Sequence, residues 1–157
     1  MDGIQLRPVS LEGLSGIRHE TFVSSETPPE FLVIRFFGAY RIGSAGQPDA
    51  QYIIATAKAA MAAWYSRSVI LDFQDLAYQW GDNMMWVTAI RWDGGTRLDA
   101  PMAIVVGDKC RTAMMSLLPE KYEKYCADTL EQASLLCRQQ EVIYKQLLKE
   151  RRNTVKA

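Results

Sequence analysis

The stretch from Ser68 to Trp86, SVILDFQDLAYQWGDNMMW, decides the fold. It opens with an apolar run, Val69 to Leu71, which is typical of a strand buried on both faces. It closes with Asn83, a residue type that often caps a helix. A polar and aromatic turn lies between them, and in α/β proteins ligands and partners bind at the loops that follow buried strands. We therefore expect the function of the protein to involve this turn.

Two further apolar runs flank this stretch and predict two more strands. They are residues 31–40, FLVIRFFGAY, and residues 102–106, MAIVV. Helical patterns separate and follow the predicted strands, first at 49–66 and 84–90, then after Asp108 and after Asp128. Successive buried strands joined by helices predict right-handed crossovers. The fold class is therefore α/β, with a mixed or mostly parallel sheet and helices packed against it.

Polar residues that favour helix caps stand where each predicted helix begins. They are Asp49, Asn83, Asp108 and Asp128. Asp128 is followed three residues later by Glu131, which is the spacing of a capping box. We therefore expect Asp128 to cap the last helix.

The length of 157 residues is that of one domain, which we divide into three parts. Residues 1–30 carry turn signals and one short strand at 17–23, so they form an N-terminal edge segment with an antiparallel edge strand. Residues 31–150 form the α/β domain. Residues 151–157 are a basic tail that we expect to be frayed.

The composition excludes several classes of function. Lys plus Arg and Asp plus Glu are equal at 18 each, so the chain lacks the basic excess of a nucleic-acid-binding protein. No apolar run is long enough to span a membrane, and the first ten residues do not resemble a signal peptide. The three cysteines are an odd number without a CxxC spacing, which favours free thiols in a cytoplasmic protein.

No residue pattern predicts a catalytic site, a metal site or a cofactor. His19 is the only histidine, and nothing near it in the sequence supplies a nucleophile or further ligands. The loop from Gly43 to Gly46 matches no phosphate-binding motif, so we interpret it as a turn. A loose acidic set follows the central strand, and we expect turn roles for it. Its members are Asp72, Asp75, Asp82 and Asp93.

Aromatic and methionine residues gather in and after the central turn, in a number that one short helix cannot bury. Met85 and Trp86 are expected to pack in the core, whereas Trp80 and Trp92 stand in turns and are expected to be exposed. Trp, Tyr and Met are enriched at the centres of protein interfaces. We therefore predict a partner-binding site made of Tyr78, Trp80, Asp82, Asn83, Met84 and Trp92.

Residues 31 to the last helix resemble a STAS domain, the fold of the anti-sigma factor antagonists. SVILDFQDLAY is similar to the family's strand of the form VVLDLSGVxY, and the strand before it ends in Gly38 and precedes a helix. PMAIVVGDKCRTAMMSLLPEKYEKYCADTLEQA follows the family's final strand, helix, short strand and last helix. The resemblance implies a surface for a partner protein at Trp80 to Met84. The family's phosphorylatable serine is missing, because residues 79–83 contain no Ser or Thr.

These observations favour a non-enzymatic protein-binding module. It would regulate or neutralise a partner, as an anti-sigma factor antagonist or an immunity protein does, and the partner would be a regulatory protein or a toxin. A homodimer is also considered. The alternative is a small crotonase-like enzyme, because YQWGDNM is similar to the FSAGADL-like loop of that family, or another α/β enzyme that uses Asp residues at strand ends.

Overall fold

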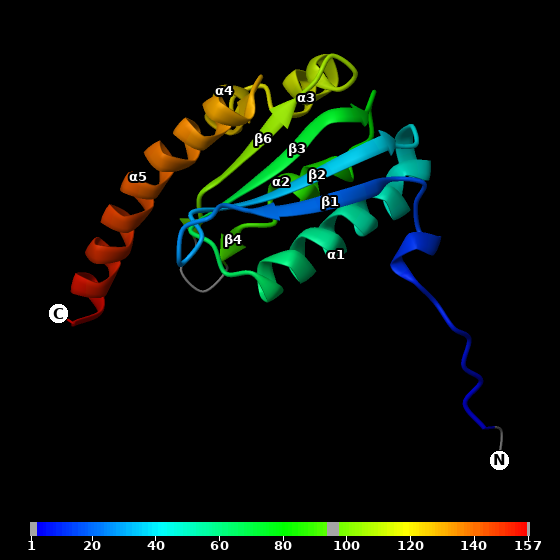
Figure 1. Ribbon diagram of the computed structural model, residues 1–157, viewed down its shortest axis with the longest axis horizontal. Coiled ribbons are helices and arrows are strands. Elements are labelled where there is room, and N and C mark those ends of the chain that lie inside the picture. Colours follow the sequence, from blue (N-terminus) through cyan, green and yellow to red (C-terminus); the bar gives the residue numbers. More distant parts are fainter. Residues whose placement is uncertain (1–2, 94–97, 157) are drawn as a thin grey trace.

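A five-stranded sheet forms the centre of the protein, seen in a computed structural model that describes residues 3–93 and 98–156 (Figure 1). The strand order is β1-β2-β3-β6-β7. β1 pairs antiparallel with β2, and the other neighbouring pairs are parallel. The prediction of an α/β fold with a mixed or mostly parallel sheet is thus confirmed, and the antiparallel edge strand is present. The strands are β1 (Arg18–Val23), β2 (Phe31–Ala39), β3 (Ser68–Ala77), β6 (Met102–Val106) and β7 (Cys126–Ala127).

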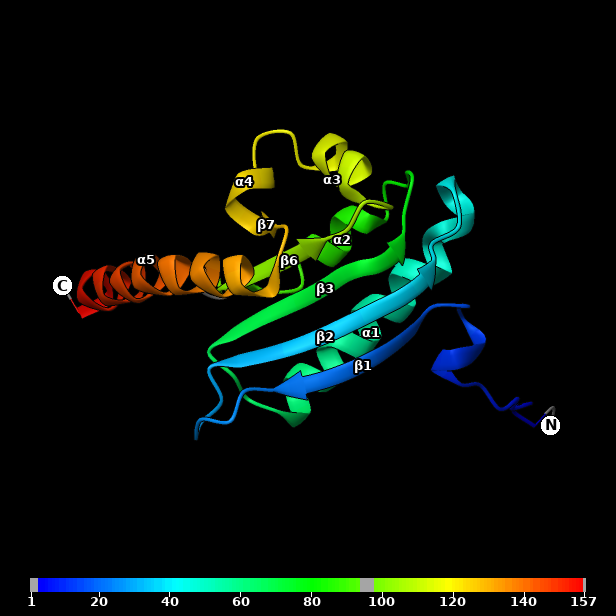
Figure 2. The same ribbon diagram turned by 45° about the horizontal axis from the view of Figure 1, so that its top comes forward.

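The helices lie on both sides of the sheet and beyond its end. α1 (Gln47–Ala63) and the short α2 (Met84–Thr88) lie on one face, and α5 (Leu130–Lys156) crosses the other (Figures 1 and 2). α3 (Arg111–Leu117) and α4 (Tyr122–Tyr125) connect β6 to β7. A small antiparallel pair, β4 (Trp92–Asp93) and β5 (Leu98–Asp99), follows α2. Two short 3-10 turns, Leu11–Gly13 and Gly43–Gly46, precede β1 and α1.

The central strand β3 explains why the sheet is covered on both faces. Val69, Leu71 and Phe73 pack in the larger core cluster together with Ile53 of α1. Ile70, which lies between them, packs instead against Cys137 of α5. Successive residues of a strand point to opposite faces, so a strand with apolar residues at consecutive positions needs cover on both sides.

The start of α5 differs from its prediction. Thr129, not Asp128, occupies the capping position: its Oγ1 accepts a hydrogen bond from the Gln132 backbone N–H at 3.2 Å. The Gln132 side-chain Oε1 in turn accepts from the Asp128 backbone N–H at 3.2 Å. This pair resembles a capping box displaced by one residue from the predicted one, except that the Gln132 side chain bonds to the N–H of the residue before the cap. The Asp128 carboxylate instead pairs with Arg111 of α3.

The other predicted caps also require correction. Asn83 does precede α2, but its side chain makes no capping hydrogen bond. Asp108 is fully exposed, and α3 begins three residues later at Arg111. Residues 151–156, predicted as a frayed tail, continue the helix α5. Side-chain oxygens near a helix start can satisfy several different backbone groups, so residue type alone does not assign the cap.

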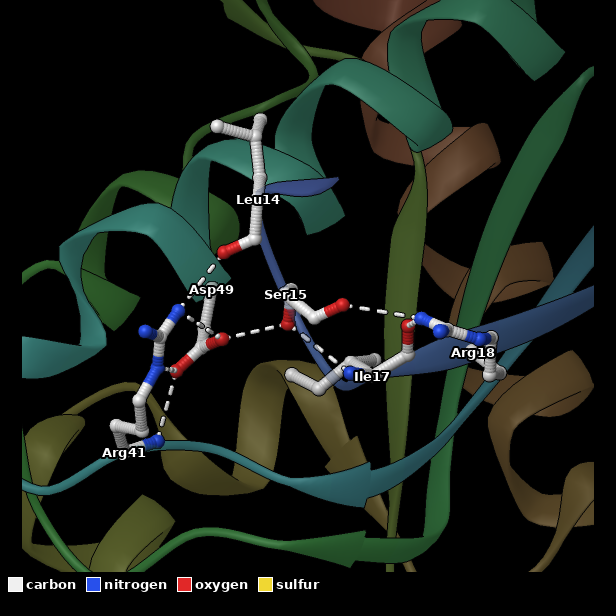
Figure 3. Close-up of polar contacts among 6 residues, drawn as sticks. All are labelled: Leu14, Ser15, Ile17, Arg18, Arg41 and Asp49. Carbon is white, nitrogen blue, oxygen red and sulfur yellow. Dashed lines mark hydrogen bonds and ion pairs between the residues drawn. The ribbon is translucent and has the colours of Figure 1, made fainter. Parts of the chain in front are cut away.

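Asp49 lies in the first turn of α1 and has a different role from the predicted one. Its fully buried carboxylate accepts hydrogen bonds from the Arg41 backbone N–H at 2.8 Å and from the Arg41 guanidinium at 3.0 Å (Figure 3). It also accepts one from the Ser15 hydroxyl at 2.5 Å. Arg41 Nη2 donates further to the Leu14 carbonyl at 2.8 Å. This network fastens the N-terminal segment to the loop between β2 and α1.

No helix within residues 3–93 and 98–156 is both long and apolar enough to cross a membrane.

Candidate functional site

A cleft of about 640 Å³ lies at the carboxyl ends of β3 and β6. One wall is the turn at residues 78–82, which follows β3. The other wall consists of residues drawn from 108–117, which follow β6 and include most of α3. The ends of adjacent parallel strands are where open α/β sheets form ligand and partner sites.

Trp80 is held at the mouth of this cleft by the neighbouring loop. Its carbonyl accepts a hydrogen bond from the Gly43 N–H at 3.2 Å. Its ring lies so close to Gly43 that a Cβ placed there would stand 2.8 Å from the ring carbon Cη2. Gly43 also has a φ of 66°, a left-handed conformation that favours glycine. Glycine at this position therefore lets the ring rest against the backbone while its other side stays exposed.

Two buried tyrosines, Tyr40 and Tyr78, pack beneath the turn at residues 78–82, on its core side. The Tyr78 hydroxyl donates a hydrogen bond to the Gly81 carbonyl at 3.1 Å, and the Tyr40 and Tyr78 rings meet edge to face with centroids 5.1 Å apart. Burial raises the pKa of both hydroxyls to about 12. Both therefore remain protonated at neutral pH, and Tyr78 acts as a hydrogen-bond donor that fixes the turn.

The helix α2 divides its residues between the core and the surface. Met84 and Val87 are completely buried, whereas Met85 and Trp86 are exposed on the opposite side. The expectation that Met85 and Trp86 pack in the core is therefore wrong. An α-helix has 3.6 residues per turn, so residues 84 and 87 lie on one side of the helix and residues 85 and 86 on the other. With the first side buried, the second faces solvent.

Trp92 extends the exposed aromatic residues beyond α2. A shallow groove of about 310 Å³ runs from Met85 and Trp86 to Trp92, and ends at α4. The exposed fractions are 59% for Trp80, 68% for Trp86 and 52% for Trp92. The expectation that Trp80 and Trp92 are exposed is confirmed. We refer to Trp80, Met85, Trp86 and Trp92 as the aromatic surface.

The structure divides the six predicted partner-binding residues. Trp80, Asp82 and Trp92 are exposed and Asn83 is half-buried, so these four are accessible. Tyr78 and Met84 are buried, so their side chains support the surface without forming part of it. Met85 and Trp86 were missing from the predicted set. The apolar spacing of Met84 and Val87 is the signal that could have found them, because it identifies which side of α2 faces the core.

The acidic residues do not gather into one site. Asp72 is buried on the sheet face opposite α1, where it accepts hydrogen bonds from Arg35 Nε and the Gln74 backbone N–H, both at 3.0 Å. Asp82 lines the cleft and is exposed, and Asp75 is exposed. The side chain of Asp93 lies outside the described residues. Among the residues that are described, no group of three or more His, Cys, Asp or Glu side chains is arranged to hold a metal ion.

The remaining reactive side chains have structural partners. His19 Nδ1 lies 2.8 Å from the Tyr52 hydroxyl of α1, within hydrogen-bond distance. Cys110 borders the cleft but is buried, with its thiol 3.5 Å from the Phe73 carbonyl. Burial raises the pKa of the Cys110 thiol, which makes it a weak nucleophile at neutral pH.

Neither the models of known protein families nor the curated proteins match this chain.

Proposed function

We propose that the protein is a non-enzymatic binding module of STAS-like type, which regulates or neutralises a partner protein that docks on the aromatic surface. The observation that carries the proposal is the exposure of Trp80, Trp86 and Trp92 along two hollows, the cleft and the shallow groove, which meet at Met85. Large aromatic side chains are the commonest interface hot spots, and a monomeric surface rarely presents several together without a use.

The rigidity of the turn supports this proposal. Trp80 rests against Gly43, and the turn is fixed from inside by Tyr78. A side chain that is already held in place loses little conformational freedom when a partner covers it. Binding to such a surface therefore has little entropic cost from ordering the turn.

The positions of the acidic residues also favour binding over catalysis. Asp72, a candidate acid or base, is occupied by its ion pair with Arg35 on the sheet face crossed by α5. Asp82 is exposed to solvent at the rim of the cleft. General acid–base catalysis requires a carboxyl group placed within hydrogen-bond reach of a bound substrate and shielded from water.

The partner is proposed to be a toxin or a regulatory protein, and the product of the neighbouring gene is the first candidate. Purified protein would be titrated with that product in a calorimeter. Trp86→Ala should weaken binding by about 2 kcal/mol, the usual size of an aromatic hot spot. Trp86 is the most exposed tryptophan of the surface, so the same variant should keep the melting temperature of the native protein.

Tyr65→Ala is the matched control, because Tyr65 is also an exposed aromatic residue but lines neither the cleft nor the groove of the aromatic surface. It should bind as the native protein does. Equal weakening by both substitutions, or by neither, would contradict a contact centred on the aromatic surface. A turnover that Asp82→Asn abolishes would replace the proposal with the enzyme alternative.

A further inference from the structure

The sheet face crossed by α5 is only half covered. Neighbouring strands lie about 4.8 Å apart and a helix is about 10 Å wide, so one helix covers roughly two strands. α5 packs over β3 and β6, where it contributes Ala133 and Cys137 to the core. Figure 2 shows β1 and β2 lying beside it without a helix above them. This face has room for a second helix next to α5.

An apolar groove marks this open area. Its volume is about 470 Å³, and it lies between the start of α5 and the ends of β1 and β2. Phe22 and Val33 of the sheet line one side, and Leu130 and Ser134 of α5 line the other. Phe22 is 47% exposed although it is a large aromatic residue in a strand. The groove therefore presents apolar surface that water solvates poorly.

The second half of α5 extends beyond the five-stranded sheet, so its apolar side chains have no strand of that sheet to pack on. Cys137 and Gln140 face the sheet, with the Gln140 side chain bonded to both backbone groups of Met102. Figure 1 shows the later residues of the helix projecting past the amino ends of the strands. Tyr144, Leu148 and Val155 continue the same side of the helix at spacings of four and seven residues. Val155 is 87% exposed.

The charges of the projecting half and of the groove are complementary. Residues 145–156 contain five Lys or Arg residues and one Glu. Glu131 lines the groove, and the exposed Glu26 lies in the loop that follows Ser24 at its edge. Arg35 and Arg138 lie over the rings of Phe22 and Phe31, which line the groove, and the two arginines are paired with Asp72 and Glu30. An antiparallel pairing of two α5 helices brings the basic end of each helix beside the acidic start of the other.

From these observations we infer that two copies of the chain associate by exchanging the projecting halves of α5. The half from each copy lies in the apolar groove of the other, so the contact is made twice around a two-fold axis. Leu148 and Val155 of one copy fill the space beside Phe22 of the second. Lys149 and Arg152 lie near the second copy's Glu131. The contacts of Leu148, Val155 and Phe22 include no residue of the aromatic surface, although Tyr144 lines one shallow pocket together with Trp92.

Sedimentation analysis of the full chain over a range of concentrations tests this inference. The native protein should form a dimer. Val155→Asp and Phe22→Asp, each placing a charge in the apolar contact, should each raise the dissociation constant at least about tenfold. Val142→Asp is the matched control, because Val142 is also an exposed valine of α5 but lies on the side away from the sheet-facing residues. It should leave the dimer intact.

Mixing the two disrupted variants sharpens the test. The Phe22→Asp chain keeps a native projecting half, and the Val155→Asp chain keeps a native groove. One of the two exchanged contacts is therefore restored in the mixture, which should associate more tightly than either variant alone. A native protein that is monomeric throughout, or a dimer that both variants leave unchanged, overturns the inference. A dimer that Trp86→Ala dissolves also overturns it, and places the second copy on the aromatic surface instead.

Discussion

Two neighbouring loops at the carboxyl end of the sheet use their residues in opposite ways. The loop between β2 and α1 turns polar groups inward, where Arg41 and Ser15 donate hydrogen bonds to Asp49 in the first turn of α1 (Figure 3). The turn after β3 and the helix α2 that follows it direct apolar groups outward, where Trp80 and Trp86 face solvent. The first region stabilises the fold, and the second presents an exposed surface. Substitutions in the two regions should therefore separate stability from binding.

The largest effect is expected at Asp49. Asp49→Ala removes one member of a buried ion pair and should lower the free energy of unfolding by about 3 kcal/mol, the low end of the usual range because Arg41 is half exposed. Denaturant titration measures this loss. Partner binding by the folded fraction should be unchanged, and weaker binding there would show that the two loops are not independent.

The loss of stability caused by Asp49→Ala should depend on pH. Burial acts to raise the pKa of Asp49, but hydrogen bonds from Arg41 and Ser15 outweigh it and hold the pKa below its ordinary value. The folded state thus binds this proton less readily than the unfolded state does. The contribution of Asp49 is therefore complete above the ordinary pKa of Asp and disappears as the pH falls through the lowered value. Native protein and Asp49→Ala should converge in stability at acidic pH, and a constant difference would contradict the ion pair.

Trp80 provides the opposite test. Trp80→Ala should weaken partner binding by about 2 kcal/mol, because a rigid aromatic contact is lost. The melting temperature should fall only slightly, since one side of the ring already faces solvent. If the variant instead has a much lower melting temperature and binds the partner normally, Trp80 stabilises the fold and does not contact the partner.

Substitutions at the start of α5 should lower the free energy of unfolding by less than Asp49→Ala does. Thr129→Ala removes the capping hydroxyl and should cost about 0.5–2 kcal/mol of stability. Asp128→Ala should cost less, because it removes only an ion pair with Arg111 at the protein surface. The reverse order in chemical denaturation would restore Asp128 as the cap.

The cysteines should give the smallest effect in the folded protein. All three are free and buried, and burial raises the pKa of Cys126 and Cys137 to about 12. A thiol reagent at neutral pH should therefore react slowly with the native protein and find three thiols after denaturation. Rapid labelling of Cys110 alone would show that the cleft opens, since this residue borders it.

The comparison of the two loops also shows what the sequence can predict. The strands were predictable because apolar runs such as residues 102–106 need no partner to be recognised, and β6 has those bounds. The exposure of Trp80 was predictable from its place in a turn. The role of Asp49 was not, because Ser15 lies 34 residues away in the chain. The exposure of Trp86 was missed because the residues of α2 are apolar on nearly every side, and only the spacing of Met84 and Val87 indicates which side is buried.

Neighbouring cap-forming residues present a related limit. Asp128 and Thr129 are both residue types that cap helices, and each is followed three residues later by Glu or Gln. Choosing between them requires the position of Arg111, which draws the Asp128 carboxylate away. The local pattern therefore places the start of α5 to within a residue but does not identify the hydrogen bonds that stabilise it.

The contact between Gly43 and Trp80 has an evolutionary consequence. Position 43 is constrained twice, by its left-handed backbone and by the ring that lies on it. A small residue at position 80 would remove the second constraint but not the first. Among descendants of this chain, glycine should therefore persist at position 43 longer than tryptophan persists at position 80. A lineage that replaces its partner can redesign the side chain at position 80, but it inherits the glycine beneath it.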